Sequence, residues 1–375
     1  MRKAVLITWH DLSSAYGCLL YFADKLIDND IEVEIKSKTN LLKFNQNTKA
    51  VMKSFLNSWY GRFRGLRYFI AQIDIFIYAL INSEKTFVIN DWDFFVPLYY
   101  AKKIKPRLQV IHYNTEIFGK DVKCLKAIER FYKKHASFPD MIIECLKERA
   151  TWRKKTFNID KPIYVINNTI PAQNIDVDSN ENLDKYYEFE QDKPILIYTG
   201  KASVTRQISE VVDCIDYFHD SVNFLFLCHG KEEEYTQLKM YMKENCHYKN
   251  YMIKKAVSRT ALIKIMQHCQ IGVNYYKPNI SINHKYAAPG KIFEYMACGL
   301  NIITTNNEGV NHIVLENGIG QCIKGDESIK DTLSRLLNIG LKDKEYIQNI
   351  FRTKYCYEID STEAIEKVLC FFKKE

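Results

Sequence analysis

A lysine and a glutamate three residues apart, Lys291 and Glu294, stand at the start of a predicted helix. Pro289 can open this helix, because its missing N–H is one that the first turn leaves unpaired anyway, and Gly299 can close it in a left-handed cap. A lysine in the first turn, beside free backbone N–H groups and the positive end of the helix dipole, suits a phosphate. A carboxylate one turn later can accept hydrogen bonds from sugar hydroxyls. The pair indicates half of a nucleotide-sugar site; the alternative is a salt-bridged pair on a surface helix.

A second basic turn precedes this helix in the chain. The apolar run 194–199 is typical of a buried strand, and it leads into Gly200, where the backbone can approach a ligand closely. Lys201 and Arg206 then flank the N-terminus of a helix predicted from about residue 207. Two cations beside a helix N-terminus are a good environment for a diphosphate.

The elements that must position these residues read as helix, tight glycine turn and core strand. Ile292, Phe293 and Met296 fall at spacings that share one helix face and would bury against a sheet. Residues 301–305, which are rich in β-branched side chains, suit a buried parallel strand. Strands alternate with helices along the rest of the chain, which predicts parallel, doubly wound sheets.

The run PGKIFEYMACGLNIITT resembles the donor-binding signature of GT-B glycosyltransferases, especially the retaining family four, in which a Pro-x-Lys-x-x-Glu-Tyr-Met-Ala-x-Gly helix precedes a strand. The resemblance implies the GT-B fold: two Rossmann-like doubly wound domains facing a central cleft, with a C-terminal helix crossing back to the first domain. It implies a nucleotide sugar, UDP- or GDP-linked, as co-substrate. The donor-binding residues that it implies are Gly200, Lys201, Arg206, Lys291, Glu294, Gly290, Tyr286 and Gly309. Tyr286 stands where well-known members carry a second glutamate, which leaves open whether transfer retains or inverts configuration.

Length and pattern divide the chain into two domains of ordinary size. Residues 1–170 are predicted to form an N-terminal, acceptor-binding domain, joined by a C-terminal helix at 356–375. Residues 171–355 are predicted to form the donor-binding domain. The last helix should bury Ala364, Val368 and Phe371 on one face.

Composition favours a globular protein of the cytoplasm. The eleven cysteines are scattered, without a CxxC pair, and no signal peptide precedes the first strand, so reduced thiols are expected. No apolar run reaches the ~20 residues of a membrane span, and the nearest, 68–81, carries Gln72 and Asp74.

Charge is unevenly placed, at +11 over residues 1–170 and −3 over 171–375. Residues 49–70 mix basic side chains, among them Lys53, Arg62, Arg64 and Arg67, with aromatic ones. This composition suits the inner face of a membrane, although a solvated helix face explains it equally well. A peripheral position on the inner face of a membrane and a solvated helix face are both left open by this segment. Nucleic acid is not expected as a partner, because no recognised binding module is present.

Catalysis can be predicted only in outline. Fixed cations and a helix N-terminus can stabilise a leaving diphosphate, so the reaction is predicted to need no metal and no cofactor. The acceptor base, if one is needed, should come from the first domain, where His10 and Glu116 are candidates at strand ends. A glycosyltransferase of polysaccharide or glycoconjugate synthesis, acting on a glycan or lipid-linked saccharide, is the favoured function. The alternatives are a nucleotide-sugar 2-epimerase and a non-catalytic partner subunit.

Overall fold

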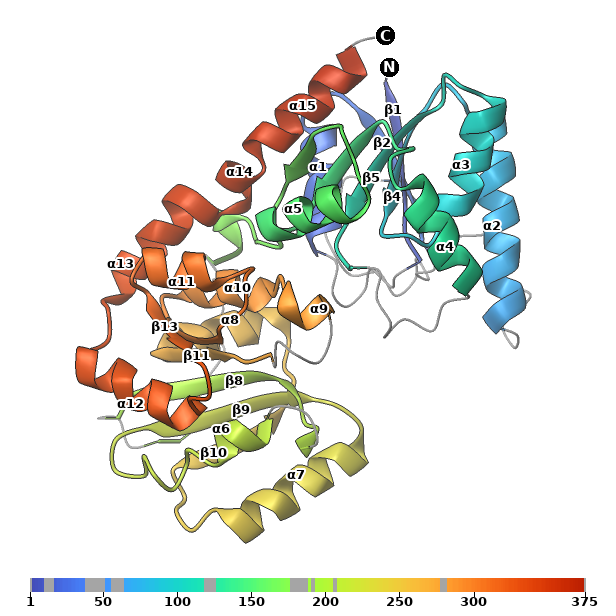
Figure 1. Cartoon of the computed structure of the whole chain (residues 1–375). Coiled ribbons are helices and arrows are strands. Elements are labelled where there is room, and N and C mark those ends of the chain that lie inside the picture. Colours follow the sequence, from blue (N-terminus) through green and yellow to red (C-terminus); the bar gives the residue numbers. More distant parts are fainter. Residues whose placement is uncertain are drawn as a thin grey trace. The chain divides into compact units, whose positions relative to one another are not determined.

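The computed structural model describes residues 2–9, 17–37, 51–54, 64–117, 126–175, 188–189, 193–204, 208–276 and 282–373. These residues form two compact units (Figure 1). The first unit comprises Met1–Asn168 together with Asp360–Glu375, and the second comprises Thr169–Ile359. The chain therefore leaves the first unit once and returns to it at its end.

The first unit is built on a parallel sheet whose described strands follow the order β3-β2-β1-β4-β5-β6-β7. Its strands are β1 (Lys3–Ile7), β2 (Glu32–Ser37), β3 (Val51–Ser54), β4 (Thr86–Asn90), β5 (Gln109–Asn114), β6 (Met141–Glu144) and β7 (Ile163–Val165). Its helices are α1 (Gly17–Ile27), α2 (Arg64–Ile81), α3 (Phe95–Ile104), α4 (Lys126–His135), α5 (Lys147–Thr156) and α15 (Thr362–Lys373). The central strands are almost wholly buried, as a parallel sheet covered on both faces requires.

The second unit repeats this plan with the strand order β10-β9-β8-β11-β12-β13, again parallel throughout. Its strands are β8 (Ile195–Lys201), β9 (Asn223–His229), β10 (Tyr251–Lys255), β11 (Ile271–Asn274), β12 (Asn301–Thr305) and β13 (Gly320–Ile323). Its helices are α6 (Ser209–Val212), α7 (Glu232–Asn245), α8 (Arg259–His268), α9 (Ile282–Lys285), α10 (Gly290–Cys298), α11 (Asn311–Glu316), α12 (Ile329–Ile339) and α13 (Lys344–Ile350). A 3₁₀ turn (Ala172–Ile175) precedes β8, a π-helical turn (Phe351–Tyr355) follows α13, and α14 (Tyr357–Asp360) leads back toward the first unit in sequence.

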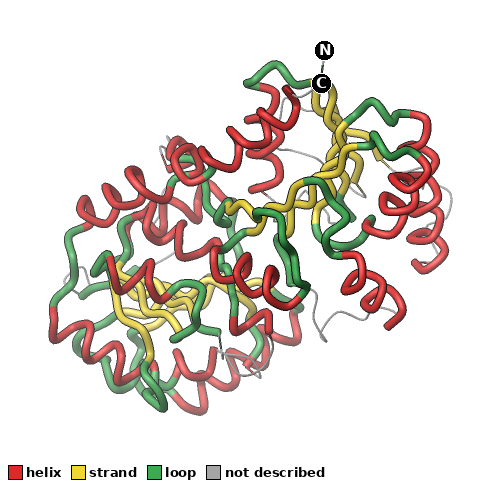
Figure 2. The backbone as a smooth tube through the Cα atoms, turned by 45° about the horizontal axis from the view of Figure 1, so that its top comes forward, coloured by secondary structure: helices red, strands yellow, loops and turns green. Residues whose placement is uncertain are grey.

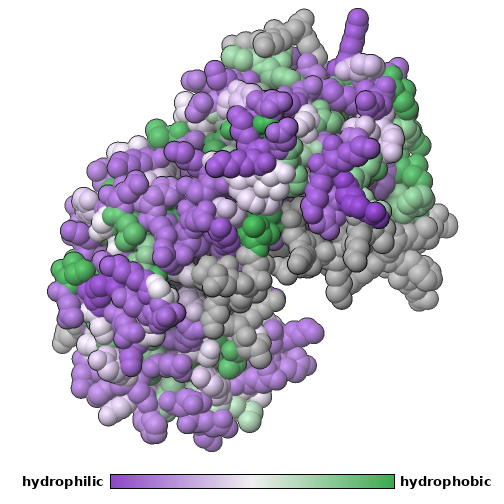
Figure 3. Space-filling model, viewed as in Figure 1, coloured by the Kyte–Doolittle hydropathy of each residue, from purple (hydrophilic) through white to green (hydrophobic). Residues whose placement is uncertain are grey.

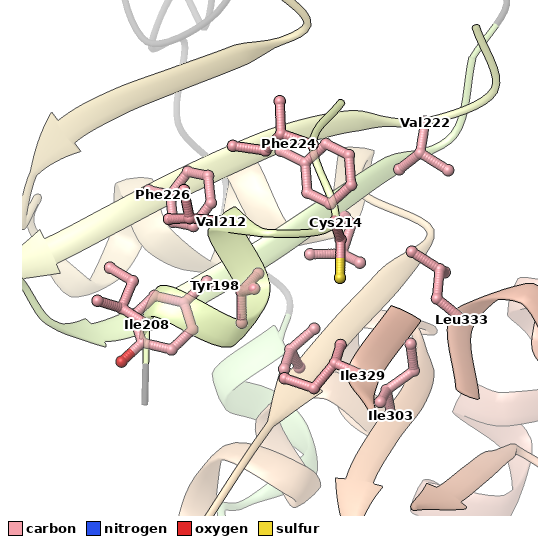
Figure 4. Close-up of a cluster of buried hydrophobic side chains, with 14 of the residues drawn as sticks. Tyr198, Ile208, Val212, Cys214, Val222, Phe224, Phe226, Ile303, Ile329 and Leu333 are labelled. Carbon is pink, nitrogen blue, oxygen red and sulfur yellow. The ribbon is translucent and has the colours of Figure 1, made fainter. Parts of the chain in front are cut away.

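In both units, helices lie on the faces of the sheet (Figure 2). The core of the second unit shows how this layering is built: aromatic side chains of β9 meet aliphatic side chains of α6 and α12 (Figure 4). Phe224 and Phe226 on β9, and Leu333 on α12, are all fully buried. Burial of this kind supplies the main favourable free energy of folding for each unit.

The predicted fold class, two doubly wound parallel α/β units with the last helix returning to the first, is confirmed. Several elements were not predicted, notably β3, α2, β13 and α12. Residues 49–70, predicted as one basic aromatic segment, contain β3 and the beginning of α2, while residues 55–63 lie outside the described part of the chain.

The C-terminal helix α15 packs against α1 and β7 of the first unit. Ala364, Val368 and Phe372 are buried along it at a spacing of four residues. The prediction that Phe371 shares this face was wrong in detail, because Phe371 is half-buried and the row continues to its neighbour Phe372 instead.

Asp360, just before α15, accepts a hydrogen bond from the backbone N–H of Asn167 at 2.7 Å and another from the Asn167 side chain. Burial raises the pKa of Asp360 to about 6, although the bonds from Asn167 favour its charged form. The folded state therefore holds this proton more tightly than the unfolded chain does. This contribution to stability is fully present below about pH 4 and is lost as the pH rises through about 6.

We expect Asp360→Asn to make the free energy of unfolding less dependent on pH between pH 4 and pH 7. The wild type should lose on the order of 2–3 kcal/mol of unfolding free energy between pH 4 and pH 7 through this group, and D360N should not. Urea unfolding across that range measures the difference. Asp326→Asn, at an exposed position, is the matched control; a D360N profile parallel to wild type would contradict the expectation.

Candidate functional site

The helix that carries Lys291 forms as predicted. Pro289 is the residue before α10, and Gly299, at φ +81°, closes it in the left-handed conformation. Ile292, Phe293 and Met296 are fully buried beneath the helix. The apolar face thus anchors α10 in the second unit and fixes the position of its first turn.

Lys291 is drawn in from this first turn onto the carboxyl end of β8. Its ammonium donates a hydrogen bond to the carbonyl oxygen of Thr199 and lies 5.9 Å from the centre of the Tyr198 ring. Burial lowers the pKa of Lys291, and the nearby Glu294 carboxylate partly opposes that effect. Among the described residues no carboxylate lies within ion-pair distance of this ammonium.

Two further basic side chains stand at the ends of neighbouring strands. Lys201, the last residue of β8, pairs in register with His229, the last residue of β9, and both are exposed. Burial lowers the pKa of His229, and the positive charges of Lys291 and Lys201 lower it further. Lys201, His229 and Lys291 therefore form one basic cluster at the carboxyl edge of the sheet, where ligands of open α/β sheets bind.

His229 was missed at the sequence level. The apolar run 223–228 predicts a strand that stops one residue before it, so the sequence alone gives the histidine no assigned neighbour. The signal was present in the adjacent runs: two parallel strands of equal length place their last residues side by side. Pairing 195–201 with 223–229 would have placed His229 next to Lys201.

The side chain of Tyr198 lies beside Gly200, where a ligand was expected to approach the backbone. The space that a Cβ at Gly200 would need is occupied by the Tyr198 side chain, whose hydroxyl oxygen would lie 2.6 Å away. Packing against Tyr198 is thus one reason for glycine here. Close approach of a ligand to this backbone remains a prediction.

Glu294 forms an ion pair with Arg259 of α8, at 2.7 Å. The surface pair considered from sequence, Lys291 with Glu294, is therefore replaced by a pair between two helices. The Glu294 side chain is mostly covered, whereas that of Arg259 is about half exposed. A partly exposed pair of this kind contributes little to stability.

The other donor-side positions lie near the two ends of this region. Gly290 is the first residue of α10, and Gly309 is buried in the turn between β12 and α11. Tyr286 is 8% exposed, so its ring is largely packed inside the unit. Arg206 lies outside the described residues.

In the first unit, Glu116 follows β5 and its side chain is exposed. Its backbone N–H and that of Thr115 both donate to the carboxylate of Asp91, at 2.8 and 2.7 Å. Arg149 donates to the carbonyl oxygen of Thr115 at 2.6 Å. The turn that presents Glu116 is therefore held from both sides, while His10, the other candidate base, lies outside the described residues.

Three Asp-x-Asp sequences occur in the chain, at 28–30, 91–93 and 176–178. The first follows α1, and the second follows β4, where the Asp91 carboxylate accepts hydrogen bonds from the backbone after β5; the third lies outside the described residues. Within the described part of the chain, no group of three or more His, Cys, Asp or Glu side chains is placed to hold a metal. In the same part, the helices are all too short or too polar to cross a bilayer.

Residues 179–353, which make up nearly all of the second unit, match the family model described as glycosyl transferases group 1. The second unit is therefore similar to that family over nearly its whole length. The matched residues include the basic cluster and helix α10. The comparison with curated protein sequences finds no match.

Solved GT-B structures resemble the whole chain in fold. A glycosyltransferase from Rickettsia africae is 12% identical with a TM-score of 0.72, covering 100% of this chain and 98% of its own. Sucrose-phosphate synthase from Thermosynechococcus elongatus is 12% identical with a TM-score of 0.73, and each chain is fully covered. HepE from Anabaena, solved with UDP and glucose, is 12% identical with a TM-score of 0.73, covering 99% of this chain and 100% of its own. At this identity the likeness establishes the GT-B fold.

Proposed function

We propose that this GT-B protein transfers a sugar from a UDP- or GDP-linked donor to a glycan or lipid-linked saccharide. The observation that carries the proposal is the position of Lys291. A cation in the first turn of α10 is held at the carboxyl edge of the sheet, close enough to Lys201 and His229 to lower the pKa of that histidine. Two lysines and a histidine at one edge of the sheet, with Glu294 paired to Arg259 and not to Lys291, favour a multiply charged anion. UDP bound to HepE, a protein of the same fold, supports a nucleoside diphosphate as that anion.

The proposed chemistry breaks the bond between the sugar and the diphosphate oxygen and forms a new bond to an acceptor hydroxyl. Negative charge grows on the leaving diphosphate, and the basic cluster with the N-terminus of α10 would stabilise it without a metal. Arg206 is proposed to join this cluster, and Gly290 and Gly309 to offer backbone N–H groups. Glu294 is proposed to hold the ribose and so to orient the donor.

The acceptor hydroxyl must lose a proton during transfer. Glu116 is the proposed base among the described residues, because its carboxylate is exposed while its backbone is held by Asp91. His10 is proposed as the second candidate. A role in polysaccharide or glycoconjugate synthesis at the inner face of a membrane, with contact through residues 49–70, belongs to the same proposal.

The alternative functions are separated by the substrates that they require. Incubation with UDP-GlcNAc alone would give a 2-epimer if the protein were an epimerase, whereas a transferase converts the donor to UDP and needs an acceptor for transfer. A non-catalytic subunit would show no saturable binding at millimolar UDP or GDP. Saturable nucleotide binding without epimer formation would support the proposal.

Glu294→Ala tests the donor site directly. We expect at least a tenfold loss of nucleotide affinity in a titration calorimeter, because a hydrogen bond to a charged group contributes roughly 1.5–3 kcal/mol. The melting temperature should change little, since the ion pair with Arg259 is partly exposed.

Arg259→Ala is the matched control, because it breaks the same ion pair and leaves the carboxylate in place. Its nucleotide affinity should stay within a few-fold of wild type. Unchanged affinity in E294A would remove Glu294 from the donor site.

A further inference from the structure

Helix α2 of the first unit is apolar on the side that faces the solvent as well as on the side that faces the core. Ala71, Ile75 and Ala79 are fully buried against the sheet and α3. On the opposite side lie Phe69, Ile73, Ile77 and Ile81, exposed by 61, 44, 50 and 74%. Residues four apart lie above one another on a helix, so these four form a row about 18 Å long.

A neighbouring helix extends this apolar surface. Helix α3 packs beside α2 and exposes Tyr100 and Ile104 in its last turns, by 50 and 58%. Apolar side chains gather over α2 at the edge of the molecule (Figure 3). We call the six residues Phe69, Ile73, Ile77, Ile81, Tyr100 and Ile104 the α2–α3 face. Monomeric proteins rarely leave a contiguous apolar surface of this size open, and one that is open marks an interaction site.

Charge beside the α2–α3 face is mainly positive. Lys103, Lys105 and Arg107 are exposed next to Ile104 in sequence, and residues 1–170 as a whole carry +11. The one acid of α2, Asp74, turns away from the row and lies 3.6 Å from Lys36. Glu84, exposed after the end of α2, is the single acidic side chain among the described residues 75–90.

We propose that the α2–α3 face binds the surface of a bilayer rich in anionic lipids. The apolar row would enter the boundary between headgroups and acyl chains, and the flanking cations would meet lipid phosphates, which is how amphipathic surface helices bind. A second copy of the chain fits less well, because a two-fold contact through this face would bring cations toward cations. This surface shares Phe69 with residues 49–70, so the inference rests on the membrane contact in the proposed function and deepens it; its binding to vesicles requires no transferase activity.

The test is co-sedimentation of the full chain with vesicles. The chain should bind vesicles of seven parts phosphatidylcholine to three parts phosphatidylglycerol at least tenfold more strongly than pure phosphatidylcholine, and added salt should weaken the binding. The double substitution Ile73→Gln and Ile77→Gln should lower binding to the anionic vesicles at least tenfold. It removes two apolar side chains that would be buried between the lipid headgroups and the acyl chains. Both positions face solvent, so matching circular dichroism and melting temperature are expected.

Ile339→Gln with Met240→Gln is the control, since both side chains are exposed apolar groups of the second unit, at 61 and 56%. Lys103→Gln with Lys105→Gln should weaken binding to the anionic vesicles, whereas Lys239→Gln with Lys243→Gln on α7 should not. Equal binding by wild type and I73Q/I77Q would overturn the proposal. So would a wild-type dimer in sedimentation velocity that I73Q/I77Q converts to monomer, because the face would then belong to a second copy.

Discussion

Replacing Lys291 by methionine is expected to lower the rate of sugar transfer about 10²–10³-fold while leaving the melting temperature unchanged or raised. The loss follows from the proposed role, because removing one preorganised donor from developing negative charge costs this much in enzymes where it has been measured. The unchanged stability follows from the environment. The ammonium is held by the carbonyl oxygen of Thr199, and burial lowers its pKa, so its charge is held at a cost to folding. A methionine of similar shape removes that cost.

The measurement pairs steady-state kinetics with thermal unfolding and nucleotide titration. Lys239→Met, at an exposed position on α7, is the control and should change none of the three. A K291M protein that keeps wild-type transfer rates would remove the basic cluster from catalysis. A protein that loses activity only because it melts earlier would show Lys291 to be structural.

Arg153→Ala, in the first unit, is expected to have the largest effect on stability. The Arg153 side chain on α5 is 1% exposed, and its guanidinium donates to Glu144 at 2.8 Å. It also lies 2.7 Å from Nδ1 of His112, which must accept because arginine can only donate. Burial keeps the pKa of His112 well below its usual value, and the charge of Arg153 lowers it further, so this imidazole is neutral.

Removing the guanidinium leaves the buried Glu144 carboxylate without its ion-pair partner. Burial already raises the pKa of this carboxylate. Breaking a buried pair on one side costs about 3–5 kcal/mol. For a unit of this size that corresponds to a fall of about 10 °C in melting temperature. Arg107→Ala, at an exposed position, should change it by about 1 °C or less.

A second variant separates the charge effect from lost packing. Arg153→Met combined with Glu144→Gln removes both charges and should recover more than half of the lost unfolding free energy. If R153A lowers the unfolding free energy by less than 1 kcal/mol, the buried network is not a source of stability for the first unit.

Much of the fold could be predicted because its strands are buried on both faces. Runs such as 194–199 and 301–305 are rich in apolar or β-branched residues, which suit a strand buried on both faces. Helix α10 was predictable because Pro289 and Gly299 mark its two ends and Ile292, Phe293 and Met296 mark its inner face. These features depend on neighbouring residues in the sequence, and the structure agrees with them.

Features that depend on distant neighbours could not be predicted in the same way. The partner of Glu294 is Arg259, thirty-five residues away, and nothing in the local spacing points to it. Helix α2 was missed because its sequence begins in the basic aromatic segment 49–70 and ends in the apolar run 68–81, so neither segment alone marks it as one element. His229 was missed because strand pairing, and not its own segment, brings it to Lys201.

The return of residues 360–375 to the first unit also affects the order in which the two units can finish folding during synthesis. The second unit, about 190 residues long, must be translated before α15 exists, which takes about 10–40 s at typical elongation rates. During that interval α1 and β7 lack the helix that packs on them. The second unit includes no segment made later than residue 359, and a hydrogen bond joins its two ends: the backbone N–H of Tyr357 donates to the carbonyl oxygen of Ile170. The second unit can therefore finish folding before the first unit, which is translated earlier but lacks α15 until the end of synthesis.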